Sequence, residues 1–188
     1  AIGLGFLLSG ILWNYNYTNI IQKRRIKIQQ KQLEQMAYYD SLTELPNRRM
    51  FEREFSQMKE YSNETLLIVI DLDNFKDIND SFGHPVGDTV LKQVADLLKK
   101  NIRESDTVSR FGGEEFVILL PNTSQEEGHA FAERIREIIM NYRFITGDIR
   151  VRLTASFGVC FLGGKNNQSM EECYCLADKA LYFAKQRG

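Results

Sequence analysis

The segment Thr107-Val-Ser-Arg-Phe-Gly-Gly-Glu-Glu-Phe-Val-Ile-Leu-Leu120 contains two strand-like runs that are separated by Gly112 and Gly113. Two adjacent glycines supply the positive φ values that tight hairpin turns require. The segment therefore predicts a β-hairpin. The carboxylates of Glu114 and Glu115 lie at the start of its second strand.

Apolar patterns on both sides of this hairpin predict the elements around it. The continuous apolar run Leu66–Ile70 is typical of a central strand that is covered on both faces. Residues 150–161 alternate like another strand. Amphipathic patterns predict helices at residues 46–61, 90–102, 131–139 and 169–184, the last opened by the capping-box pair Ser169 and Glu172. The order strand, helix, hairpin, helix, strand predicts an α+β fold with a ferredoxin-like split βαβ arrangement.

Composition limits the classes of function. The 188 residues are 43% hydrophobic and 26% charged, which is typical of a globular protein rather than of a disordered one. The formal net charge of -1 gives no overall attraction to a nucleic-acid polymer, so phosphate binding must depend on a local site. The cysteines Cys160, Cys173 and Cys175 lack the paired spacing of a zinc or redox motif, and we interpret them as reduced cytosolic residues.

Three carboxylates are expected at one corner of the sheet. In the split arrangement the central strand and the second hairpin strand are antiparallel neighbours, so one strand ends beside the start of the other. Asp71 follows the run Leu66–Ile70 and is thereby placed near Glu114 and Glu115. Clustered carboxylates repel one another, and their oxygens suit magnesium, which also binds substrate phosphates. The pattern predicts a two-metal phosphoryl-transfer site, near which Lys76 can stabilise developing negative charge.

Six blocks, in order, resemble the GGDEF family of diguanylate cyclases. The resemblance runs from about residue 38 to the end of the chain and implies a fold of the nucleotide cyclase/polymerase-palm type. It also implies that two GTP molecules are condensed into cyclic di-GMP and two pyrophosphates. The blocks are Asp40-Ser-Leu-Thr-Glu-Leu-Pro-Asn-Arg-Arg49, Asp71-Leu-Asp-Asn-Phe-Lys76 with Asn79, Phe82-Gly-His-Pro-Val-Gly-Asp88, Arg110-Phe-Gly-Gly-Glu-Glu-Phe116, Ser156-Phe-Gly-Val159 and Ala177-Asp-Lys-Ala-Leu-Tyr-Phe-Ala-Lys185.

The resemblance implies a metal site with two Mg²⁺ ions per active site, or Mn²⁺ in their place. Asp71, Glu114 and the backbone carbonyl of Leu72 would hold the metal. Glu114 or Glu115 would assist removal of the ribose 3′-hydroxyl proton, and Lys76 would stabilise the transition state. Asp73 is ranked below the metal ligands.

Substrate-binding residues are implied in the same way. Asn79 and Asp88 would read the guanine edge, and Lys185 would bind the triphosphate. The family usually continues after the last block with Gly-Arg-Asn, whereas this sequence stops at Gly188, so weaker triphosphate binding than in a longer chain with that arginine is expected. The alternatives are that Asp88 caps the following helix and that Asn79 is a turn residue.

A product-inhibition site is implied by Arg103 and Asp106, which resemble the family's Arg-x-x-Asp motif, with Arg134 as a further arginine. Guanidinium groups give forked contacts to phosphate or to a guanine edge. The alternative is an ordinary surface ion pair between Arg103 and Asp106.

The N-terminal segment combines an uncharged stretch with a basic cluster. Residues 1–22 carry no charge, Trp13, Tyr15 and Tyr17 resemble an interfacial belt, and basic residues lie at 23–27. The apolar run is shorter than the ~20 residues that a spanning helix needs. We interpret residues 1–21 as the end of a transmembrane helix, rather than as a buried helix or a signal-peptide core, because signal peptides carry their charges before the apolar run. The expected location is the inner (cytoplasmic) membrane, with the catalytic domain in the cytoplasm.

Residues 22–39 are rich in Gln, Lys and Arg, and Ile26 and Leu33 lie one heptad apart. The heptad seam is weak, so a signalling helix and a solvated linker are equal alternatives. Residues 40–188 form the predicted GGDEF domain.

The predicted enzyme is a homodimer. Each domain has one guanine-reading set and one metal corner, whereas the product contains two guanosines, so two facing domains would supply both halves. A catalytically silent GGDEF module that binds GTP or cyclic di-GMP is the alternative hypothesis, and the intact Gly-Gly-Glu-Glu-Phe signature argues against it. A purely structural dimerisation domain leaves the carboxylates unexplained.

Overall fold

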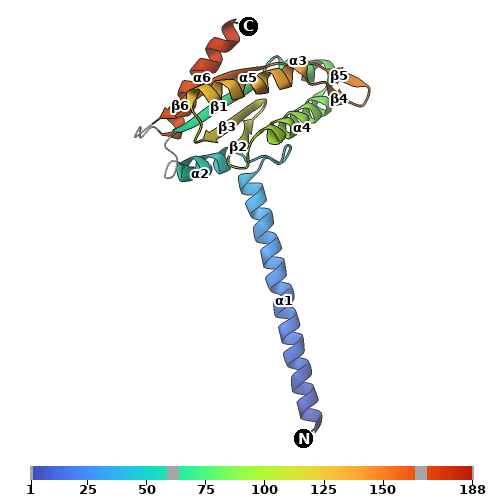
Figure 1. Ribbon diagram of the computed structural model, residues 1–188. Helices are drawn as coiled ribbons and strands as arrows, with labels where there is room; N and C mark the ends of the chain where they lie inside the picture. The colour runs from blue at the N-terminus through green and yellow to red at the C-terminus, as the bar shows by residue number, and fades with distance from the viewer. Residues whose placement is uncertain (1, 59–63, 164–168, 188) are drawn as a thin grey trace. The chain divides into compact units, whose positions relative to one another are not determined.

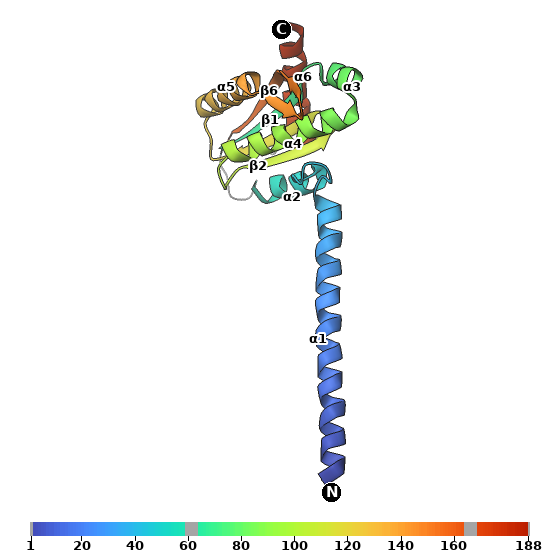
Figure 2. The ribbon, with the colours of Figure 1, turned by 90° about the vertical axis from the view of Figure 1, so that its right-hand side faces the viewer.

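The computed structural model describes residues 2–58, 64–163 and 169–187. Two compact units are present, Ala1–Ala37 and Tyr38–Gly188. The helix α1 (Ile2–Tyr38) is continuous, without a break at the predicted boundary between residues 21 and 22 (Figures 1 and 2). Most of its described large apolar side chains, such as Trp13 and Leu33, are exposed, while Ile21 is partly buried. Within the described ranges, no helix has a stretch that is both long and apolar enough to cross a membrane.

The second unit is built on a four-stranded antiparallel sheet with the order β2-β3-β1-β6 (Figure 1). Its strands are β1 (Glu64–Leu72), β2 (Thr107–Gly112), β3 (Glu115–Pro121) and β6 (Ala155–Gly163). The first strand pairs antiparallel with both β3 and β6. This is the strand order of the ferredoxin-like split arrangement, so the predicted α+β fold is confirmed.

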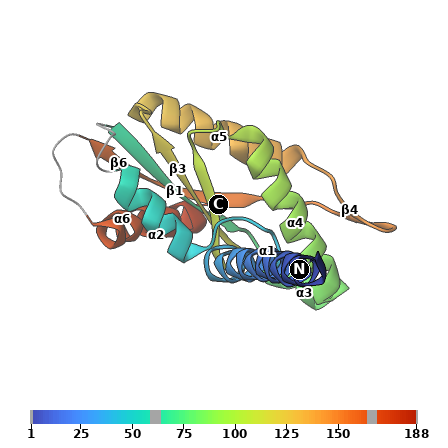
Figure 3. The same cartoon turned by 90° about the horizontal axis from the view of Figure 1, so that it is seen from below.

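Helices cover both faces of the sheet, as Figure 3 shows. One face packs against α4 (His84–Asn101) and α5 (Gln125–Asn141), and the other packs against α2 (Arg48–Met58) and α6 (Met170–Arg187). Successive side chains of a strand point to opposite faces, and alternate residues of β1 accordingly enter the two cores. The continuous apolar run 66–70 is therefore buried on both sides, as predicted.

Two parts of the fold differ from the prediction. The helix α3 (Phe75–Phe82) was not predicted; it is short, and it follows Asn74 in the left-handed conformation with φ 53°. The single strand predicted for 150–161 is wrong, because β5 (Ile149–Val151) pairs with β4 (Phe144–Thr146) and β6 begins only at Ala155. Burial alternates without interruption through Val151, Leu153 and Ala155. The alternation of buried and exposed side chains therefore continues through this segment. It does not reveal where the chain leaves the pair β4–β5 and joins β1 as β6.

The last helix is fixed at its start and along its length. Ser169 and Glu172 form the predicted capping box, with the Ser169 N–H donating to Glu172 Oε2 over 2.8 Å and the Glu172 N–H donating to Ser169 Oγ over 3.2 Å. Farther along, α6 packs so closely on Gly158 of β6 that a Cβ there would overlap the Ala177 carbonyl oxygen. This packing determines where the C-terminal turns of α6 lie.

Candidate functional site

Acidic side chains gather where β1 ends and β3 begins, and we call Asp71, Glu114, Glu115 and Asp178 the acidic corner. Asp71 lies opposite Glu115 in the β1–β3 register, and the Leu72 N–H donates to the Glu114 carbonyl over 3.4 Å. The strand order thus brings the three predicted carboxylates together, as the sequence indicated. Their chemical roles stay predictions.

The last helix adds two charged groups to the acidic corner. Lys185 Nζ lies 2.7 Å from Asp71 Oδ1. Asp178, a residue of α6 that the sequence did not indicate as part of the site, raises the pKa of the Glu115 carboxyl through its negative charge. Its spacing of seven from Lys185 places both on one side of a helix, which is the signal that could have found it.

The electrostatics of the acidic corner are unfavourable for negative charge. Burial raises the pKa of the Glu115 carboxyl, and the charges of Asp71, Asp178 and Glu114 raise it further, while Lys185 opposes them. Burial, followed by Glu115 and Asp178, also raises the pKa of the Tyr174 hydroxyl. A cation bound in the acidic corner would relieve this repulsion.

The donor set of the acidic corner fits magnesium. Two carboxylates, Asp71 and Glu114, and the backbone carbonyl of Leu72 are hard oxygen donors. No group of three or more His, Cys, Asp and Glu side chains is arranged to hold a metal in the part of the chain that the structure describes. Magnesium is usually held by only one or two carboxylates together with substrate phosphates and water, so this partial set suits it.

Asp73 has a different role from Asp71. Thr154 Oγ1 donates to Asp73 Oδ2, and Ser156 Oγ donates to Asp73 Oδ1, both over 2.7 Å. The Asp73 N–H also donates to the Thr154 carbonyl over 2.9 Å. Asp73 thereby ties the end of β1 to the start of β6, which supports ranking it below the metal ligands.

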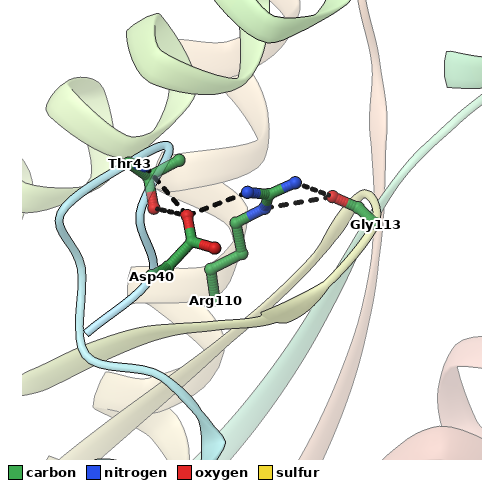
Figure 4. A network of polar contacts seen from close by, with 4 residues as sticks. All are labelled: Asp40, Thr43, Arg110 and Gly113. Carbon is green, nitrogen blue, oxygen red and sulfur yellow. Dashed lines mark hydrogen bonds and ion pairs between the residues drawn. The ribbon is translucent and has the colours of Figure 1, made fainter. Parts of the chain in front are cut away.

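Arg110 connects the segment after α1 to the Gly-Gly turn (Figure 4). Its Nη1 donates to Asp40 Oδ1 over 2.8 Å, while its Nε and Nη2 donate to the Gly113 carbonyl over 3.1 and 2.8 Å. Asp40 Oδ1 also accepts from the Thr43 N–H over 2.8 Å and from Thr43 Oγ1 over 2.6 Å. Burial favours a raised pKa for Asp40, but the hydrogen bonds from Thr43 and Arg110 hold it below the ordinary value. This network fixes the carbonyl that immediately precedes Glu114.

Replacement of Asp40 by Asn is expected to lower the free energy of unfolding by about 1–3 kcal/mol at pH 7.5, because it leaves the Arg110 guanidinium, only 10% exposed, without its carboxylate. The depressed pKa means that Asp40 stabilises the fold fully above the ordinary carboxyl value of 3.8, and that this contribution is lost as the pH falls through the lower folded value. Urea unfolding at pH 7.5 and near pH 3 measures both effects.

The control is Glu52→Gln, which breaks the exposed Arg48–Glu52 ion pair. That change is expected to cost at most about 0.5 kcal/mol. An Asp40→Asn cost no larger than the control's at pH 7.5 would contradict the structural importance of the network.

Asn79 and Asp88 lie on adjacent helices, and both alternative interpretations of them are wrong. Asp88 is inside α4, whose N-cap is Gly83 with φ 84°, so it does not cap the helix. Asn79 is inside α3 and is not a turn residue. A Cβ at Gly87 would overlap Asn79 Oδ1, so this glycine leaves room for the Asn79 amide beside Asp88. Lys76, one turn before Asn79 on α3, is exposed.

Arg103, Asp106 and Arg134 gather at the end of α4, from two segments. The Arg103 N–H donates to Asp106 Oδ2 over 2.8 Å. Arg134 Nη1 and Nη2 donate to Asn101 Oδ1 and to the Asn101 carbonyl over 3.2 and 3.1 Å. No side-chain ion pair joins Arg103 to Asp106 within the described ranges, so the alternative of an ordinary ion pair is wrong.

Comparison with known proteins gives one consistent family. The family described as "Diguanylate cyclase, GGDEF domain" matches residues 37–188. The diguanylate cyclase DgcP of Pseudomonas aeruginosa is 43% identical over 158 residues, which are 82% of this chain and 23% of that protein. The probable diguanylate cyclase DgcT of Escherichia coli is 40% identical over 160 residues, which are 81% of this chain and 34% of that protein. The chain therefore spans about a quarter to a third of these relatives.

Solved structures show the same likeness. The coiled coil and GGDEF domain of DgcB from Caulobacter crescentus, in complex with c-di-GMP, superposes with a TM-score of 0.84 at 26% identity, covering 94% of this chain and 95% of that one. The diguanylate cyclase SiaD from Pseudomonas aeruginosa, in complex with its activator SiaC, gives a TM-score of 0.75 at 30% identity, covering 100% and 74%.

Proposed function

Because the chain belongs to the GGDEF family of diguanylate cyclases, we propose that it condenses two GTP molecules into cyclic di-GMP and two pyrophosphates. In each half-reaction a ribose 3′-oxygen attacks the α-phosphorus of the other GTP, and pyrophosphate leaves. The observation that supports this most is the gathering of Asp71, Glu114 and Glu115 at the end of β1. Incubation of the protein with GTP and magnesium, followed by identification of the nucleotide products, tests it.

The acidic corner supplies the chemistry. Asp71, Glu114 and the Leu72 carbonyl would hold Mg²⁺, or Mn²⁺ in its place, which lowers the pKa of a bound hydroxyl and offsets phosphate charge. Glu115 suits acceptance of the 3′-hydroxyl proton, since burial and its acidic neighbours raise its pKa. Glu114 is the alternative proton acceptor.

Residues around the acidic corner would bind and orient the substrate. Lys76 and Lys185 are the cations proposed to stabilise the phosphate charge. An acceptor carboxylate, Asp88, and the amide of Asn79 suit the donor and acceptor groups of a guanine edge. The room that Gly87 leaves for Asn79 supports this pairing.

Specific activity is expected to rise with protein concentration in the dilute range, since each domain offers one guanine-reading set while the product needs two. The proposed active form is a symmetric homodimer of facing domains. Initial rates measured across a dilution series, with light scattering on the same samples, test this. A constant specific activity from a proven monomer would exclude the dimer requirement.

Feedback by cyclic di-GMP is proposed at Arg103, Asp106 and Arg134, whose gathering from two segments supports a phosphate and guanine site. Arg103→Ala is expected to keep the initial rate and to lose inhibition by added cyclic di-GMP. Progress curves at several product concentrations measure this. The matched control is Arg143→Ala, another exposed arginine, and an Arg103→Ala curve that overlays the control's would contradict the assignment.

A silent module that only binds the nucleotide is the second candidate, and the product assay distinguishes the two.

The location at the inner membrane also stays a prediction. The uncharged residues 1–22 and the basic cluster that follows support it. Fractionation of cells that express the protein tests it.

A further inference from the structure

Lys185 is the cation that compensates the acidic corner. Its ammonium lies 2.7 Å from Asp71 Oδ1, and the Asp71 side chain is only 14% exposed, whereas that of Lys185 is 40% exposed. The lysine therefore reaches from the last turns of α6 to a largely buried carboxylate, while part of its own side chain stays exposed to solvent. Lys179, on the same helix, forms no ion pair within the described ranges.

The acidic corner depends on this compensation. Asp71, Glu114 and Asp178 all oppose the negative charge on Glu115, and Lys185 is the group that favours it. Asp71 Oδ1, which accepts from the Lys185 ammonium at 2.7 Å, belongs to a carboxylate that a divalent cation at this end of β1 would also use as a ligand. The Lys185 ammonium and the divalent cation would therefore compete for the Asp71 carboxylate. Their positive charges would also repel each other at this distance.

We propose that Lys185 is the resident counter-ion of Asp71 in the metal-free domain, and that a divalent metal displaces it from Asp71. This inference rests on the metal site of the proposed function. The four-carbon stem of lysine is flexible, so the released ammonium can turn towards the triphosphate that arrives with the metal. A metal that binds without nucleotide displaces the Lys185 ammonium and leaves it without a new partner. When a nucleotide binds together with the metal, its triphosphate provides that partner.

Metal and triphosphate binding are coupled as a consequence. Each ligand raises the affinity for the other, because the triphosphate takes up the charge that the metal expels from Asp71. The metal site is thereby kept weak until the substrate is present. The same interaction stabilises the metal-free domain, because the lysine offsets repulsion among the carboxylates.

The test is a titration with Mn²⁺ in the absence of nucleotide, followed by electron paramagnetic resonance of the free ion. Lys185→Gln is expected to bind Mn²⁺ about two- to fivefold more tightly than the parent, the range that loss of one partly exposed competing charge gives. Lys185→Arg, which keeps a cation, and Lys179→Gln, which removes a cation elsewhere on α6, are expected to bind like the parent. Addition of Asp71→Asn to Lys185→Gln is expected to remove the gain.

Equal or weaker binding by Lys185→Gln, no detectable binding by either protein, or a gain that persists in the double variant would overturn the inference. The proposed function fails by a different measurement. It is wrong if the parent makes no cyclic di-GMP from GTP, and the titration without nucleotide is independent of that result.

Discussion

Replacement of Asp71 by Asn, or of Glu114 by Gln, is expected to lower the rate of cyclic di-GMP formation by about 10²–10³-fold, with magnesium as the metal. Each change removes one negative charge from the acidic corner, and each leaves the side chain nearly the same size. The domain is expected to stay folded, because both residues lie at the rim of the sheet and outside its two apolar cores. Initial rates at saturating GTP and thermal unfolding of the same samples measure the two effects.

Asp73→Asn is the matched control for this pair. It makes the same chemical change two residues farther along the chain. Asp73 accepts hydrogen bonds from Thr154 and Ser156, and within the described residues it forms no ion pair. We expect it to change stability more than turnover, with a rate loss below about tenfold. If Asp71→Asn or Glu114→Gln keeps near-normal activity, or if Asp73→Asn is as inactive as they are, the metal site is assigned wrongly.

Replacement of Gly158 by Ala is expected to cost about 3–4 kcal/mol of stability, which is above the usual cost of one extra methyl group in a core. The added Cβ would overlap the Ala177 carbonyl oxygen and lie 2.7 Å from the Leu181 nitrogen. Both are backbone atoms of α6, so the clash is relieved only by moving the helix away from β6. The midpoint of thermal unfolding should fall by about 10 °C.

Gly128→Ala provides a graded comparison, because its nearest neighbours would be methyl groups of the Leu66 side chain rather than backbone. A leucine side chain can change rotamer, so this variant is expected to lose only about 1–2 kcal/mol.

Movement of α6 would also carry Lys185 away from Asp71, so Gly158→Ala is expected to weaken GTP binding under conditions in which it stays folded. A Gly158→Ala protein as stable as the parent would mean that α6 does not pack on β6 as the structure has it.

Local patterns in the sequence were sufficient for the centre of the fold. The run 66–70 is apolar at every position, and the Gly-Gly turn separates two strand-like runs, so the strands and their order followed from periodicity and topology. That order alone places Asp71 beside Glu115. The short helix α3 could not be predicted in the same way, because it has only Phe75 and Ile78 buried and starts from the left-handed Asn74.

Contacts between distant side chains were not predictable from one sequence. Arg110 and Asp40 are 70 residues apart, and no local pattern specifies that the same guanidinium also holds the Gly113 carbonyl. The ion pair between Lys185 and Asp71 likewise depends on how closely α6 packs against Gly158. Such pairs are fixed by tertiary packing, which periodicity does not report.

The strand order also has a consequence for synthesis on the ribosome. The central strand β1 is the first strand of the sheet to be made, yet its neighbour β6 is made roughly eighty residues later. At translation rates of about 5–20 residues per second, the edge of β1 that pairs with β6 stays unpaired for on the order of ten seconds. Unpaired apolar edges recruit chaperones or other nascent chains. Translation that stops between β3 and β6 is therefore expected to yield an aggregating chain rather than a partly working domain.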